Sequence, residues 1–284
     1  MTAQIIDGKK IAAELRQTLT NQISDYYSKY HIKPGLAVIQ IGEDPASSIY
    51  VRNKRLACEQ VGIHSIIYHL PETITEKELL ELIHNLNNDT TIHGILVQLP
   101  LPKQVNIQTI LESIAPHKDV DGFHPYNIGR LAQKKPLLRP CTPYGIMTLL
   151  NKININVLSM DAVIIGASNI VGKPMSLELL LAGATVTICH SKTKNIAEHI
   201  KRADLLIAAI GQPGFIKTDW IKPNAIIFDV GINRTSDGKI VGDIDFDTAK
   251  EIAAWITPVP GGVGPMTVTA LLFNTLSAAC LQTI

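Results

Sequence analysis

The chain has 284 residues, which is more than one hydrophobic core usually holds, so two domains are expected. Hydrophobic residues make up 46% of the chain, which allows buried sheets and excludes a disordered protein. Lysine plus arginine (26) nearly balances aspartate plus glutamate (25), and the basic residues are scattered, so nothing favours a nucleic-acid partner.

The four cysteines lie far apart without a paired CxxC spacing, and the nine histidines show no paired ligand spacing, so we expect no metal site. Widely spaced cysteines are typical of a reducing compartment. The first residues, MTAQIIDGKK, are charged and lack an apolar signal core. No uninterrupted apolar run approaches the roughly 20 residues of a membrane span. We therefore expect a cytoplasmic protein with no membrane partner.

Hydrophobic periodicity predicts alternating strands and helices in the first part of the chain. Ile11, Leu15, Leu19 and Ile23 recur at four-residue steps, as on one face of a helix. Thr75, followed three residues later by a glutamate, is typical of a capped helix start. In chain order the patterns predict a helix over 8–30, a strand over 36–42, a helix over 47–62, a strand over 64–70, a helix over 75–89 and a strand over 93–102.

Residues 103–142 are rich in proline, glycine and histidine, and we interpret them as the join between two domains. A helix over 143–152 should follow. The remaining patterns predict strands over 161–168, 185–190, 203–210, 225–232 and 253–262, with helices over 172–183, 195–201 and from about 264 to 284.

The predicted fold is α/β with two domains and a cleft between them. A three-layer α/β domain is expected over 1–120, and a Rossmann-like doubly wound domain over 121–263. The last helix is long and apolar, so we expect it to pack back on the first domain.

The stretch VIIGASNIVGKP resembles a dinucleotide-binding turn between a strand and a helix. Gly166, Ala167 and Ser168 are small enough for a pyrophosphate to approach the backbone, and Gly172 begins a helix whose N-terminus favours anions. The spacing departs from G-x-G-x-x-G, so an ordinary strand–helix turn stays an alternative.

The end of the next predicted strand lacks the carboxylate that NAD-type sites use for the ribose 2′-hydroxyl. It carries Ser191, Lys192 and Lys194 instead, a hydroxyl and two ammonium groups that suit a 2′-phosphate. This pattern favours NADP over NAD; the alternative is a solvated surface turn.

Four polar residues are expected to face one crevice. Tyr50 and Lys54 lie one helical turn apart after a strand, Gln98 ends the strand GILVQ, and Asp121 lies in the domain join. Each has an ordinary alternative: a half-buried aromatic, a surface lysine, an amide that satisfies a loop, and an Asp-Gly turn.

The segments EDPASSIYVRNK, GILVQLPLP, KDVDGFHPYNIGRL, VIIGASNIVGKP and PVPGGVGPMT, in this order, resemble the bifunctional methylenetetrahydrofolate dehydrogenase/methenyltetrahydrofolate cyclohydrolase family (FolD-type). The resemblance covers almost the whole chain. It implies oxidation of 5,10-methylenetetrahydrofolate with NADP and hydrolysis of the methenyl product to 10-formyltetrahydrofolate. It further implies a homodimer formed through the second domain and a place in one-carbon metabolism, which serves purine, methionine and histidine biosynthesis.

The resemblance also implies roles for particular residues. Lys54, Tyr50, Gln98 and Asp121 match the family's catalytic positions, with Tyr50, Asp121, Pro260 and Gly262 at the folate. The implied cofactor contacts are Gly166, Ala167, Ser168, Gly172, Ser191 and Ile232.

Two departures from the family pattern affect the choice of cofactor. Many members have a basic residue in place of Ala167, and some have arginine in place of Ser191. Two alternative functions stay open: a shikimate-type NADP dehydrogenase, and a catalytically silent regulator that binds folate or NADP.

Overall fold

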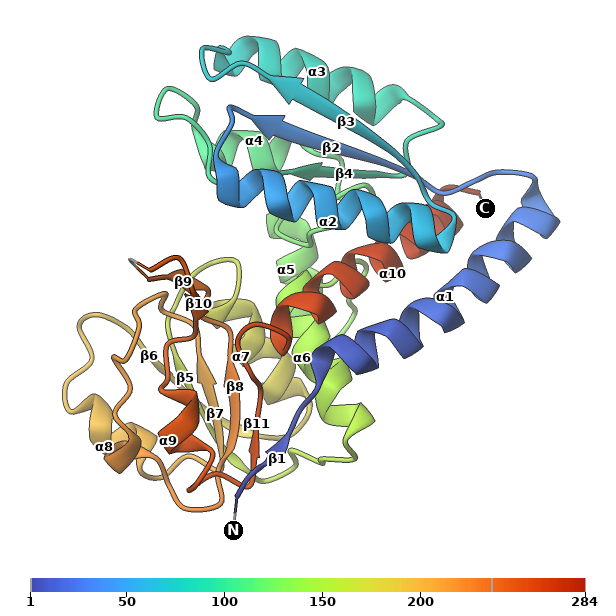
Figure 1. Ribbon diagram of the computed structural model, residues 1–284. Helices are drawn as coiled ribbons and strands as arrows, with labels where there is room; N and C mark the ends of the chain where they lie inside the picture. The colour runs from blue at the N-terminus through green and yellow to red at the C-terminus, as the bar shows by residue number, and fades with distance from the viewer. Residues whose placement is uncertain (1, 236, 284) are drawn as a thin grey trace. The chain divides into compact units, whose positions relative to one another are not determined.

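The computed structural model of the protein describes residues 2–235 and 237–283 (Figure 1). The chain divides into two compact units: unit 1 holds residues 1–13 and 142–267, and unit 2 holds residues 14–141 and 268–284. The α/β fold with two domains is confirmed. The boundary differs from the expected one, because residues 121–141 group with unit 2 and the first 13 residues group with unit 1.

Local contacts explain both differences. Gln4 and Ile5 form a short strand that pairs in parallel with Trp255 and Ile256 of unit 1. At the other boundary, the amide N–H of Cys141 donates to the Asp121 carbonyl at 3.2 Å, which holds the end of the expected join within unit 2.

Unit 2 is built on a three-stranded parallel sheet in the order β3-β2-β4. The central strand is buried along its whole length, as its unbroken apolar run GLAVIQI predicts. Figure 1 shows β2 between β3 and β4, with the helices on both sides of the sheet. The elements are β2 (Gly35–Ile41), α2 (Pro45–Val61), β3 (His64–Leu70), α3 (Glu76–Asn88), β4 (Gly94–Val97), α4 (Ile107–Ser113) and α5 (Pro125–Ala132).

The capped start predicted for α3 is confirmed. The Thr75 side chain accepts from the Glu78 N–H, and the Glu78 carboxylate accepts from the Thr75 N–H at 2.9 Å. Leu79, Ile83 and Leu86 of this helix then pack with Ile39 of β2 in one hydrophobic core. The cap therefore fixes the position at which the apolar stripe of α3 begins.

Unit 1 is built on a six-stranded sheet in the order β1-β11-β8-β7-β5-β6, and every pairing in it is parallel. The chain therefore winds outward from β5 in both directions, as in a doubly wound nucleotide-binding sheet. The elements are β1 (Gln4–Ile5), α6 (Cys141–Lys152), β5 (Asp161–Ile165), α7 (Gly172–Leu181), β6 (Thr185–Cys189), α8 (Ile196–Ile200), β7 (Leu205–Ala208), a 3-10 turn (Thr218–Trp220), β8 (Ile226–Asp229), β9 (Asn233–Arg234), β10 (Ile240–Val241), α9 (Phe246–Ala249) and β11 (Trp255–Ile256).

The sequence patterns missed the shortest elements. Helices α4 and α5 lie inside the segment interpreted as a join, and each begins at a capped residue, Asn106 and His124. The hairpin β9–β10, strand β1 and helix α9 have two to four residues each, too few to show a periodicity.

Two long helices continue across the unit boundary: α1 (Gly8–Tyr30) and α10 (Val263–Thr283). Residues 268–284 group with unit 2. The Asn274 amide N–H donates to the carbonyls of Val120 (2.8 Å) and Arg139 (2.7 Å).

Helix α10 is long and apolar enough to meet a length-and-composition criterion for a membrane span, although the sequence analysis expected none. Within the part of α10 that meets this criterion, 67% is buried inside the protein, which is also typical of a core helix.

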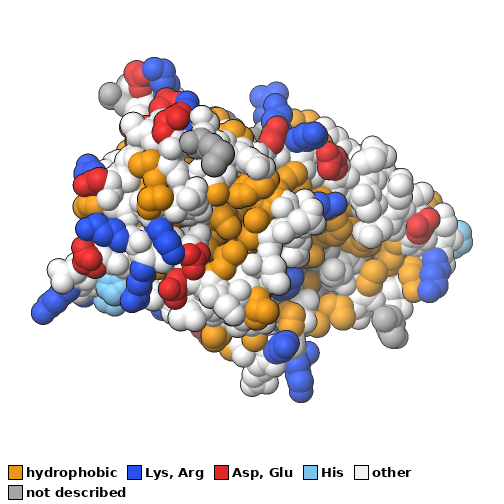
Figure 2. All heavy atoms as spheres, turned by 90° about the horizontal axis from the view of Figure 1, so that it is seen from below, with side chains coloured by type: hydrophobic (Ala, Val, Ile, Leu, Met, Phe, Trp, Pro, Cys, Tyr) orange, Lys and Arg blue, Asp and Glu red, His pale blue; other side chains and the backbone are white. Residues whose placement is uncertain are grey.

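On the face drawn in Figure 2, acidic and basic side chains are interspersed, in keeping with a formal net charge of +1.

Candidate functional site

Lys54 and Gln98 meet in unit 2. Lys54 lies on α2 and is only 9% exposed, and its Nζ donates to Gln98 Oε1 at 3.0 Å. Gln98 follows β4, and its Nε2 donates to the Leu99 carbonyl at 2.9 Å, which turns the amide oxygen toward the lysine. The surface-lysine alternative is therefore wrong for Lys54, because a surface lysine keeps its ammonium in water.

Tyr50 precedes Lys54 by one turn of α2 and is half-buried. Burial raises the pKa of the Tyr50 phenol, so the hydroxyl stays protonated at neutral pH and can donate or accept a hydrogen bond. The predicted pairing of a phenol and an amine on one helix face is thus present.

Asp121 lies in a loop that a second aspartate organises. The buried Asp119 carboxylate accepts from the N–H groups of Phe123 (3.2 Å) and His124 (2.8 Å). Gly122 has a φ of +75°, and an added Cβ there would lie 2.5 Å from the Arg139 carbonyl carbon, so only glycine fits this turn.

Electrostatics link Asp121 to the lysine. Burial raises the pKa of the Asp121 carboxyl, and the positive charge of Lys54 opposes that rise. The thiol of Cys141 donates to the Val120 carbonyl at 3.1 Å, and burial raises the pKa of the thiol well above its usual value. In unit 2 the Lys54 amine therefore bonds the Gln98 amide, and the charge of that amine acts on the Asp121 carboxyl.

The predicted phosphate loop forms a tight turn in unit 1. Gly166 has a φ of +122°, and an added Cβ would lie 2.2 Å from the Ala209 carbonyl oxygen; at Gly172 it would lie 1.9 Å from the Gly166 oxygen. Ser168 Oγ accepts from the Val171 N–H at 3.1 Å, just before α7 begins. Ala167 lies between them. These residues leave room for a phosphate to approach the backbone.

The loop after β6 is exposed and basic. The His190 N–H donates to Thr193 Oγ1 at 2.9 Å, and the Lys192 N–H donates to His190 Nδ1 at 3.1 Å. These bonds shape a short loop on which Ser191, Lys192 and Lys194 are exposed. The predicted hydroxyl and ammonium groups therefore lie on one loop at the carboxyl end of β6.

The other predicted contacts also belong to unit 1. Ile232 follows β8 and is 48% exposed. Pro260 is exposed, whereas Gly262 is buried, and an added Cβ at Gly262 would lie 2.6 Å from the Pro258 carbonyl oxygen. The predicted folate residues therefore fall in both units, with Tyr50 and Asp121 in unit 2.

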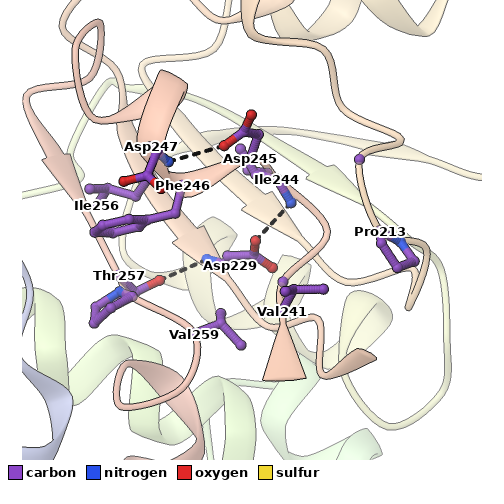
Figure 3. A pocket seen from close by; sticks show the side chains of 13 residues that line it. Pro213, Asp229, Val241, Ile244, Asp245, Phe246, Asp247, Ile256, Thr257 and Val259 are labelled. Atoms are coloured by element: carbon purple, nitrogen blue, oxygen red, sulfur yellow. Dashed lines mark hydrogen bonds between the residues drawn. The ribbon is translucent and has the colours of Figure 1, made fainter. Parts of the chain in front are cut away.

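A cavity of about 510 Å³ opens beside β8 and β11, and none of the predicted cofactor residues lines it. Figure 3 shows Asp229 among its side chains, with hydrogen bonds to Thr257 and to the Ile244 N–H. Burial raises the pKa of Asp229 to about 6, and the charge of Asp243 adds to the rise.

Asp119, Asp229 and Asp243, the buried carboxylates that shape these loops, are not among the residues predicted above for the site. Asp119 lies in the motif KDVDGFHP, and Asp229 lies inside the strand predicted over 225–232, which ends at this residue in the structure. These positions are the sequence signals that could have identified the carboxylates, because a polar residue at the carboxyl end of a strand is unusual in an apolar run.

A doubly wound sheet with a phosphate turn after its first strand is typical of the class of dinucleotide-binding enzymes, and here it is joined to a unit that carries a buried lysine. Residues 6–121 match the model of the tetrahydrofolate dehydrogenase/cyclohydrolase catalytic domain, and residues 140–283 match the NAD(P)-binding domain of the same family. The chain belongs to the tetrahydrofolate dehydrogenase/cyclohydrolase family.

Solved structures of other family members are similar over nearly their whole length. The bifunctional FolD methylenetetrahydrofolate dehydrogenase/cyclohydrolase of Campylobacter jejuni is 50% identical, with a TM-score of 0.96 over 98% of this chain and 99% of that one. The Trypanosoma brucei enzyme, solved with NADP cofactor and an inhibitor, is 36% identical, with a TM-score of 0.96 over 99% and 98%. A shikimate dehydrogenase of Peptoclostridium difficile shares the fold at 14% identity and a TM-score of 0.54, over 87% and 91%.

Proposed function

We propose that this protein oxidises 5,10-methylenetetrahydrofolate with NADP to 5,10-methenyltetrahydrofolate and hydrolyses that product to 10-formyltetrahydrofolate. Family membership supports both activities. The observation that carries the proposal is the bond between the buried Lys54 ammonium and Gln98, with Asp121 close enough to interact electrostatically. The shikimate alternative has only a distant likeness of fold to support it.

The first step removes a hydride from the methylene carbon and leaves a cation on the folate. NADP, when bound, would supply the hydride acceptor, and the protein contributes alignment more than proton transfer. The cradle at Gly166 and Gly172 fits a pyrophosphate, and Ser191, Lys192 and Lys194 suit a 2′-phosphate. We expect the two lysines to replace the basic residue that many relatives have at the position of Ala167.

The second step adds water to the methenyl carbon, breaks one of its two carbon–nitrogen bonds and delivers a proton to the departing nitrogen. These transfers need a positioned acid–base group. We assign that role to Lys54, held by Gln98 and flanked by Tyr50. Asp121 would accept N–H groups from the 2-amino-4-oxo edge of the pterin, because one carboxylate can take two such bonds.

The family resemblance also implies folate contacts at Pro260 and Gly262, which lie in one turn of unit 1. Gly261 has a φ of +108°, and its carbonyl accepts from the Lys9 N–H at 2.9 Å, so the turn is anchored to α1 within unit 1. Exposed Pro260 leaves one side of this turn free to meet a ligand.

We extend the proposal to a homodimer formed through unit 1. Strand β6 lies at the edge of the six-stranded sheet, and open edges favour pairing with another chain. Leu158 and Leu180 are 62% and 59% exposed; an added Cβ at Gly183 would meet the Leu158 side chain, and the Gly183 N–H donates to the Leu180 carbonyl at 3.0 Å. We also propose that the protein is cytoplasmic and that it acts in one-carbon metabolism, which serves purine, methionine and histidine biosynthesis.

A spectrophotometric assay of the purified protein with 5,10-methylenetetrahydrofolate tests the function. With NADP we expect reduced cofactor to form, followed by conversion of methenyltetrahydrofolate to 10-formyltetrahydrofolate. The rate with NAD in place of NADP should be lower, since NAD lacks the 2′-phosphate. Binding of both ligands without turnover would instead support a silent regulator and contradict the proposal.

A further inference from the structure

Asp243 is a fully buried carboxylate (0% exposed) that the proposed chemistry does not use. It lies between β10 and α9. Its Oδ2 accepts from the N–H groups of Ile210 (2.8 Å) and Gly211 (3.1 Å). Its Oδ1 accepts from the Gln212 N–H (2.8 Å) and from Asn233 Nδ2 (3.0 Å). One carboxylate therefore joins the loop after β7 to the loop after β8.

The Asp229 carboxylate holds the backbone of Asp243 in place. Asp229 is the last residue of β8, is 4% exposed, and its carboxylate accepts from the N–H groups of Gly231 (2.9 Å), Asp243 (3.0 Å) and Ile244 (2.9 Å). An added Cβ at Gly242 would lie 2.0 Å from Asp229 Oδ2, and at Gly231 2.3 Å from Asp243 Oδ1. Both glycines thus let the carboxylates approach the backbone.

The two loops joined by Asp243 lie at the carboxyl ends of β7 and β8, the edge where a doubly wound sheet binds its dinucleotide. An added Cβ at Gly166 would lie 2.2 Å from the Ala209 oxygen, so the β7 loop packs against the phosphate turn. The β5–α7–β6 half carries the residues suited to the adenosine 2′-phosphate. The β7 and β8 loops therefore belong to the nicotinamide half.

We infer that Asp243 is a positioning residue for the nicotinamide half of the cofactor, acting through the N–H groups of residues 210–212 and through Asn233. This inference rests on the proposed NADP-dependent dehydrogenase. Four N–H donors converge on the carboxylate, and an ionised carboxyl is the side chain that accepts hydrogen bonds without donating any. Two adjacent buried aspartates cost desolvation and repulsion, which a purely packing role would not require.

The test compares Asp243→Asn with Asp245→Asn in the full-length protein. An asparagine at 243 turns an NH₂ group toward N–H donors, and we expect KM for NADP to rise about tenfold or more, as for lost hydrogen bonds to a buried charge. Hydrolysis of methenyltetrahydrofolate needs no hydride acceptor and should stay within about twofold of wild type. Asp245 caps α9, where asparagine is an equally good cap, so its variant should match wild type in both assays.

An unchanged KM for NADP would overturn the inference, and so would an equal loss of both activities, which indicates general damage. If Asp243→Asn does not fold, Asn233→Ala decides: it removes one donor to Asp243 and should raise KM for NADP while leaving KM for the folate unchanged. An unchanged KM for NADP in this variant also overturns the inference. Failure of the proposed function would have a different result: the wild-type protein itself would oxidise no methylenetetrahydrofolate.

Discussion

Asp229 shows how a single buried carboxyl couples the stability of unit 1 to pH. Its ordinary pKa of 3.8 rises to about 6 in the folded protein, because burial disfavours the charged form. The folded state therefore binds a proton more tightly than the unfolded state. The resulting stabilisation is complete below the unfolded pKa and is lost as the pH rises through the folded pKa.

We predict that the free energy of unfolding falls by about 2 kcal/mol between pH 4 and pH 7 on account of Asp229 alone, at about 1.36 kcal/mol per pKa unit and with part of the whole effect lying below pH 4. Denaturant unfolding at several pH values, for wild type and Asp229→Asn, checks this. The difference between the two proteins should change over that pH range. Parallel stability curves for the two would show that Asp229 does not titrate there.

Sequence patterns identified the residues of the candidate site more easily than their supports. Helical spacing placed Tyr50 and Lys54 on one face, and strand ends located Gln98. The support by Asp243 is non-local: its carboxylate bonds residues up to 33 positions away, and no spacing rule connects them. Such contacts depend on strand order, which periodicity does not provide.

At the scale of elements, the capping box of α3 makes a direct prediction. Thr75→Ala removes the side chain that accepts from the Glu78 N–H, and should lower the free energy of unfolding by about 1 kcal/mol. Thr73, two residues earlier and outside the helix, is the matched control, and Thr73→Ala should change stability by less than about 0.5 kcal/mol. Chemical denaturation measures both, and equal losses would argue against the cap.

Long periodic elements were predictable, and short or irregular ones were not. The helix over 8–30 and the strand over 64–70 have their predicted bounds. The strand predicted over 93–102 ends at Val97, since Pro100 and Pro102 have no N–H for a strand ladder. Helix α5 was missed because its start, HisPro, looks like part of a loop, although proline suits the first turn of a helix.

At the scale of the whole molecule, the proposed dimer predicts a mass of twice 31.0 kDa. Leu180→Lys places a charge on an exposed apolar position of α7, the helix that contacts β6, and should shift the protein toward the monomer. Ile107 of unit 2 is 44% exposed, and Ile107→Lys serves as the control that should leave the mass unchanged. Analytical ultracentrifugation distinguishes these outcomes; a monomeric wild-type protein would refute the dimer.

The division into units shows what a linear pattern leaves out. The composition change after residue 103 indicated a join, but residues 121–141 are held to unit 2 by backbone and Asn274 hydrogen bonds. The strand β1 pairs with a strand about 250 positions later, a distance at which sequence spacing carries no signal.

The central claim is that Lys54 is the acid–base group of the hydrolytic step, and Lys54→Met tests it most directly. A positioned acid–base group contributes at least about a hundredfold, so we predict a loss of that size in methenyltetrahydrofolate hydrolysis with NADP binding unchanged. Arg55→Met, an exposed neighbour on the same helix, should hydrolyse at the wild-type rate. A Lys54→Met protein that hydrolyses methenyltetrahydrofolate as fast as wild type would contradict the account.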